Sequence, residues 1–171
     1  LRYAYGDIKV RFDMPGEEPL PLGRDRSLRL AALTPTITYD SRDNLFTPER
    51  GLFFDAAWSI ADNAFGSDRD FQRVDLIGLA FHPVSDRVFL GAKAAARWSS
   101  DETPFYLRPF VQLRGVQAMR YQGSEAGEIE VEARWQFHPR FSVVGFGGVG
   151  VAAGRSWLDG ERETVAAGGA G

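Results

Sequence analysis

The feature that most constrains this chain is an alternation of polar and apolar residues with a period of two. The clearest block runs from Glu128 to Phe137. Its polar positions are Glu128, Glu130, Glu132, Arg134 and Gln136, and its apolar positions are Ile129, Val131, Ala133, Trp135 and Phe137. Because successive side chains of a strand point to opposite faces, this block predicts a strand with one polar face and one apolar face.

Similar blocks recur along the chain, each about ten residues long and bounded by turn-forming residues. We predict strands at 3–12, 28–39, 53–60, 71–82, 88–98, 128–137 and 141–151, with a truncated eighth strand beginning near Glu163. Strands of this length approach the ~9–11 residues that a transmembrane strand needs. The sequence therefore predicts an all-β, antiparallel protein.

The predicted connections alternate in length. Those at 14–26, 61–70, 99–124 and 153–162 are long, those at 83–86 and 138–139 are very short, and the one at 41–50 is intermediate. Tight turns at one end of a sheet and longer loops at the other are typical of outer-membrane barrels.

Composition excludes several classes. Twenty basic and twenty-three acidic residues give a net charge of −3 without any run of like charge, so nucleic acid is not an expected partner. The absence of cysteine excludes disulfides and thiolate metal sites. No stretch approaches ~18 consecutive apolar residues, so only strands could cross a membrane. The chain opens and ends inside strand-like sequence, and we expect residues 1–171 to be part of a barrel domain, truncated at both ends.

Alternation alone does not distinguish a lipid-facing wall from the core of a soluble barrel. Aromatic residues near predicted strand ends favour the membrane, where they would form an interfacial girdle; they are Tyr39, Phe81, Trp98, Trp135 and Phe137. On this interpretation the residues expected to face lipid include Trp58, Trp98, Ile129, Val131 and Trp135.

Three segments carry more specific patterns. The first, at 39–51, holds Asp40, Arg42, Asn44, Pro48 and Gly51 between two predicted strands. The second is the pair Arg114-Gly115 inside the longest loop, and the third is the Glu-rich strand at 127–135 followed by the glycine-rich one at 143–150. In this order they resemble the BamA/TamA-type outer-membrane proteins, in the assembly-factor superfamily that includes the bacterial surface antigen family.

That resemblance implies a sixteen-stranded, up-and-down transmembrane β-barrel in the bacterial outer membrane, of which this chain would supply seven to eight strands. The long loop at 99–124 would be the sixth outer loop and would fold back into the lumen. The implied function is assembly or insertion of outer-membrane proteins, or polypeptide translocation, with no enzymatic chemistry and no cofactor. The implied partners are outer-membrane lipids and unfolded outer-membrane or secreted polypeptides. An amino-terminal periplasmic region is also expected.

Three alternatives stay open at this stage. Within the membrane class, the chain could belong to a secretion pore for one partner or to the barrel anchor of a fused patatin-like lipase. Outside that class, it could be a soluble β-barrel that binds a small ligand.

The candidate site lies in the predicted lumen. The long loop is rich in Phe, Leu, Val and Met, so we expect it to tuck inward and carry Arg114 towards a carboxylate, with Glu132 as the first candidate and Glu130 as the second. The resembled family has a Phe-x-Asp-x-Gly motif, but here Gly148 occupies the Asp position. This departure would leave the arginine one acidic partner short.

Other constellations have plainer explanations. Glu128, Glu130 and Glu132 could suggest an acid/base set, but alternate carboxylates on a strand are ordinary neighbours on a wet wall. His82 and His138 lack an evident third ligand for a metal. The glycines at 145–150 are followed by no Lys-Ser/Thr pair, so a phosphate loop is not predicted.

Overall fold

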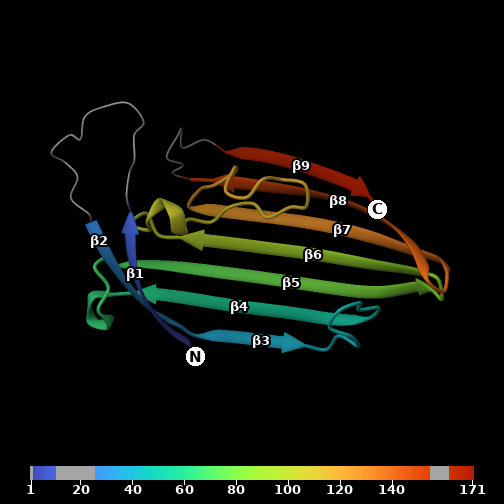
Figure 1. Cartoon of the computed structure of the whole chain (residues 1–171), viewed down its shortest axis with the longest axis horizontal. Coiled ribbons are helices and arrows are strands. Elements are labelled where there is room, and N and C mark those ends of the chain that lie inside the picture. The colour runs from blue at the N-terminus through green and yellow to red at the C-terminus, as the bar shows by residue number, and fades with distance from the viewer. Residues whose placement is uncertain (1, 11–25, 155–161) are drawn as a thin grey trace.

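The computed structural model describes residues 2–10, 26–154 and 162–171. They form one antiparallel sheet in the order β1-β2-β4-β5-β6-β7-β8-β9, and β2 and β3 both pair with β4 (Figure 1). The strands are β1 (Arg2–Val10), β2 (Arg26–Thr34), β3 (Thr36–Asp40), β4 (Gly51–Ala61), β5 (Phe71–Ser85), β6 (Val88–Ser99), β7 (Glu125–His138), β8 (Phe141–Ala153) and β9 (Glu163–Ala170). Short 3-10 helices, η1 (Asn63–Phe65) and η2 (Phe105–Leu107), lie between strands.

The predicted all-β, up-and-down fold is therefore confirmed. The sheet is not closed into a barrel by the described residues, and it fits part of one. Among the described residues, no helix is long and apolar enough to span a membrane.

The strand predicted at 28–39 is split into β2 and β3 at Pro35. Proline has no N–H to donate to a ladder, although the Pro35 carbonyl still accepts the N–H of Trp58 at 3.1 Å. Beyond this break β2 keeps only two pairings to β4, and in Figure 1 β1 and β2 diverge from the direction of the other strands.

Some predicted boundaries were wrong. The connection expected at 83–86 belongs largely to β5, which continues to Ser85 through a register shift between Pro83 and Ser85. A proline at a bulge sacrifices no regular ladder bond, and the turn itself consists of Asp86 and Arg87. Positions 11–12 of the first predicted strand, and most of the connections at 14–26 and 153–162, lie outside the described residues.

Register assigns every side chain of β4 to β8 to one of two faces. Directly opposed residues share a face, so the row Phe54, Gly78, Ala94, Ile129 and Val149 defines an apolar face. All five residues predicted to face lipid lie on it, and their side chains are exposed: Trp58, Trp98, Ile129, Val131 and Trp135.

The opposite face is polar. It carries Asp55, Asp75, Lys93, Arg97, Glu128, Glu130 and Glu132. Phe81, which we predicted in an aromatic girdle, also lies on this polar face, opposite Gly91. A Cβ on Gly91 would lie 3.4 Å from the Phe81 ring, so the missing side chain makes room for the aromatic ring.

Candidate functional site

The 100–124 loop lies against the polar face of the sheet, over β6 to β8 (Figure 1). Its side chains Val111 and Leu113 are 1% and 5% exposed and form a buried cluster with Ala152 of β8. Apolar loop residues thus pack on the glycine-rich strand, while the polar loop atoms meet the charges of β6 and β7. The buried faces of the loop explain why it does not extend into solvent.

Arg114 is held by two carboxylates of β7. Its Nε donates to Glu130 Oε1 at 2.7 Å, and its Nη1 donates to Glu132 Oε2 at 2.6 Å. Its main-chain N–H also donates to Glu130 Oε2 at 3.2 Å. The guanidinium carbon lies 4.0 Å from the centroid of the Phe146 ring, within cation-π range.

The structure thus brings together the three charged residues that the sequence singled out, but in a different order of importance. We ranked Glu132 first, yet Glu130 receives both the main chain and the side chain of Arg114 and is itself 8% exposed. The loop backbone approaches β7 at Glu130, a detail that period-two patterning does not contain.

Gly115 has a local conformational role. The N–H of Val116 donates to the carbonyl of Leu113 at 3.2 Å, closing a four-residue turn with Arg114 and Gly115 at its centre. Gly115 has a φ of 79°, and a positive φ at the third turn position favours glycine. The Arg-Gly pair therefore combines the cation with the residue that turns the chain away after it.

Gly148 has a steric explanation. A Cβ at this position would lie 2.9 Å from Leu113 Cδ2 and 2.8 Å from the carbonyl oxygen of Ile129. The neighbouring Gly150 is similar, since its Cβ would lie 2.4 Å from Val111 Cγ1. The residue that replaces the family's Asp thus opens a seat for the loop's apolar side chains.

A second ionic cluster was missed by the sequence analysis. Arg97 Nη1 of β6 donates to both carboxylate oxygens of Glu128, at 3.0 and 2.7 Å, and Lys93 Nζ lies 3.3 Å from the same carboxylate. Lys93 also donates to the carbonyl of Gln112 in the loop at 2.6 Å, and Arg97 Nη2 donates to the Gln112 side chain at 3.2 Å. Alternation had placed these charges on one face, but only the strand register makes them neighbours.

The cluster continues onto β5. Arg73 donates to both oxygens of Asp75, at 2.8 and 2.6 Å, and to the carbonyl of Leu107 in the loop at 3.0 Å. Two neighbouring strands, β5 and β6, therefore contribute cations that contact the loop's main chain.

The predicted hairpin motif forms the connection between β3 and β4. Arg42 makes two side-chain hydrogen bonds to Asp40, at 2.9 and 2.7 Å. The Asn44 side chain accepts the N–H of Phe46 at 2.8 Å, and Gly51 has a φ of 109°. Half-buried Pro48 and Arg42 line a small hollow between this hairpin and residues of β5 to β7. Asp40, Arg42, Asn44 and Gly51 thus shape this hairpin.

Asp43, in the same hairpin, accepts the N–H groups of Glu49 and Arg50 at 3.0 and 3.3 Å. The hydrogen bond from the Glu49 N–H is the largest cause of the lowered pKa of the Asp43 carboxyl; desolvation opposes it, and the hydrogen bond from the Arg50 N–H adds to it. Hydrogen bonds to a carboxylate favour its charged form.

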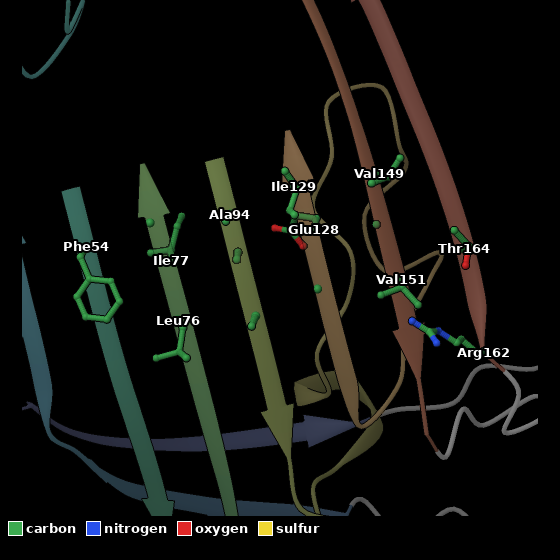
Figure 2. Close-up of a pocket in the computed structure, with 15 residues that line it drawn as sticks. Phe54, Leu76, Ile77, Ala94, Glu128, Ile129, Val149, Val151, Arg162 and Thr164 are labelled. Atoms are coloured by element: carbon green, nitrogen blue, oxygen red, sulfur yellow. The ribbon is translucent and has the colours of Figure 1, made fainter. Parts of the chain in front are cut away.

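The apolar face carries a shallow hollow of about 700 Å³ (Figure 2). Small residues line its centre, and larger apolar ones from β4 to β8 flank it, among them Phe54, Leu76, Ile129 and Val149. Three polar residues, Glu128, Arg162 and Thr164, also contribute to the lining.

The glutamates and His138, which the sequence analysis considered for acid/base or metal chemistry, have ordinary structural partners. Glu128, Glu130 and Glu132 each contact a cation, and the His138 ring accepts the N–H of Arg140 at 3.3 Å. In the described part of the chain, no group of three or more His, Cys, Asp or Glu side chains is arranged to hold a metal ion.

Comparison with known proteins places this geometry in a family. The model of the Omp85 superfamily domain matches residues 2–146, which include β1 to β7 and the 100–124 loop. No curated protein matches the chain.

Proposed function

Because this chain belongs to the Omp85 superfamily of outer-membrane insertion and translocation proteins, we propose that it forms part of a barrel that assembles other proteins into the bacterial outer membrane. Its clients would be unfolded outer-membrane polypeptides, and its work would involve no covalent chemistry. The observation that carries the proposal is the seating of the Arg114 loop on the acidic strand β7.

Aromatic spacing on the apolar face supports contact with lipid. Trp135 pairs with Val88 of β6, and Val88 and Trp98 lie ten residues apart on that strand. At ~3.4 Å per residue this is ~34 Å along the strand. With a tilt of about 40° the height is ~26 Å, close to the ~25 Å apolar band of outer-membrane barrels. The Trp residues would then lie at the two membrane interfaces.

The seated loop supports a role in handling polypeptides. Its main chain and the β7 carboxylates occupy the polar face, so an extended client segment would meet a lumen already filled by the loop. Movement of this loop would change how much polar wall is available to a client. Arg114, at the loop's turn, is the residue whose loss would most directly loosen its tip.

The experiment is reconstitution of the full-length protein in liposomes with an unfolded client barrel. Folding of the client is followed by its shift in electrophoretic migration without heating. Arg114→Ala should lower the yield of folded client strongly, whereas Arg140→Ala, which removes an exposed arginine from the β7–β8 turn, should not. Equal client folding with both variants would reject the proposal.

Location is tested separately. The full-length protein should fractionate with outer membranes and show heat-modifiable migration, because its apolar strand faces require a lipid or detergent environment. Recovery as a soluble monomer without detergent would contradict the proposed membrane location.

A further inference from the structure

We propose that Arg97 and Glu128 form the fixed anchor of the 100–124 loop, which sets the loop's register along β7 and so positions Arg114 on Glu130. The inference deepens the proposed function, since it rests on that function for the meaning of Arg114. Arg97 and Glu128 are positioning residues that stay attached. The contact between Arg114 and its carboxylates is the one that opens when the loop tip moves away from β7.

The loop runs beside β7 with the same two-residue step. The N–H of Gln112 donates to Glu128 Oε2 at 3.3 Å, and the N–H of Arg114 donates to Glu130 Oε2 at 3.2 Å. Two residues of extended chain advance ~6.8 Å in either element, so the Gln112–Glu128 contact fixes where Arg114 falls. A shift by one such step would present the Arg114 N–H to Glu128 or Glu132 in place of Glu130.

Burial distinguishes the two ends of this ladder. The Arg97 and Glu128 side chains are 7% and 0% exposed, whereas Arg114 is 43% exposed and its carboxylate partners Glu130 and Glu132 are 10% and 35% exposed. Removing one partner of a shielded ion pair leaves an uncompensated charge and is strongly destabilising, whereas exposed pairs contribute little. The shielded pair is therefore the permanent attachment, and the exposed end is the one that can open.

The anchor also contacts the loop's backbone. Besides binding Glu128, Arg97 lies 3.5 Å from the Phe110 carbonyl and donates to the Gln112 side chain. Lys93 shares Glu128 and donates to the Gln112 carbonyl. Near the Arg97–Glu128 pair, the strands thus present two cations and one carboxylate to the loop. Asp75 Oδ1 lies 3.7 Å from Nε of the Arg97 guanidinium.

Thiol labelling can report on each end of the loop separately. Residues 1–171 contain no cysteine, and any cysteine elsewhere in the full-length protein is first replaced by serine. A single Val111→Cys change reports on the anchored segment, where the side chain is 1% exposed, and Val116→Cys reports on the turn. Each is introduced into the folded, full-length protein in detergent, and its reaction with a maleimide is timed without any client present.

Arg97→Gln should speed labelling at Val111→Cys on the order of tenfold or more, relative to Arg140→Gln, which makes the same change on the exposed turn. Arg114→Gln should speed labelling at Val116→Cys while leaving Val111→Cys protected. The anchor is rejected if Arg97→Gln labels no faster than the control, or if Arg114→Gln releases Val111→Cys to the same extent.

Heat-modifiable migration verifies that each variant is folded. Should Arg97→Gln fail to fold, Arg97→Lys is compared with Arg140→Lys. It keeps the charge but has one nitrogen in place of Nη1, which bonds Glu128, and Nη2, which bonds Gln112. The anchor is again rejected if Val111→Cys labels no faster than in the control. Labelling needs no client, so a failed anchor and a failed assembly activity are separate results.

Discussion

Substitution of Val131 by arginine tests the assignment of the two faces. Val131 is 56% exposed on the apolar face and pairs with Ala92, four residues from Val88 and six from Trp98 on β6. At ~3.4 Å per residue and a tilt of about 40°, it lies ~10 Å from one aromatic level and ~16 Å from the other. This is close to the middle of the bilayer.

An arginine near the midplane of a barrel wall costs ~2–4 kcal/mol, and ~3 kcal/mol corresponds to roughly a hundredfold change in the unfolding equilibrium. Denaturant unfolding of the full-length protein in liposomes, followed by tryptophan fluorescence, measures this cost. Thr38→Arg is the matched control, because Thr38 is exposed on the polar face and bonds Asp55 at 2.6 Å. If Thr38→Arg cost as much as Val131→Arg, the faces would be wrongly assigned by one residue.

Three further changes test the site. Arg114→Lys should lose more client-folding activity than its retained charge suggests, because one ammonium replaces a planar fork between two carboxylates; activity equal to wild type would contradict this. Gly148→Asp should destabilise the folded protein, because a Cβ there would lie 2.9 Å from Leu113 Cδ2 and 2.8 Å from the Ile129 carbonyl oxygen; urea unfolding measures the loss, and unchanged stability would contradict the steric explanation. Asp43→Ala should reduce the loss of folding stability that occurs as the pH is lowered. Because the pKa of Asp43 is lower in the folded protein, this carboxylate stabilises the fold above its unfolded pKa near 3.9, and the stabilisation is lost as the pH falls through the folded pKa. An unchanged dependence of stability on acid pH would refute this prediction.

The sequence predicted the faces of the strands well because alternation depends only on the pleat of each strand. It predicted that Arg114 would meet β7 carboxylates because an inward cation needs such a partner. It did not identify the pairing of Arg97 with Glu128, since residues 31 positions apart become neighbours only through the register of β6 against β7. The split at Pro35 was also missed, although a proline inside a predicted strand is itself a signal that the strand is interrupted.

The loop is held largely through its main chain. Wall cations on β5 and β6 bond its carbonyls, wall carboxylates on β7 accept its N–H groups, and Gly148 and Gly150 of β8 leave room for its apolar side chains. Main-chain contacts are indifferent to side-chain identity, so most of the information that seats the loop resides in the wall. Several loop side chains also take part: the Arg114 guanidinium bonds Glu132, the Gln112 side chain accepts from Arg97, and Val111 and Leu113 are buried against β8. A loop seated in this way has its sequence constrained mainly from Val111 to Gly115, whereas the polar faces of β6, β7 and β8 are constrained along the whole contact.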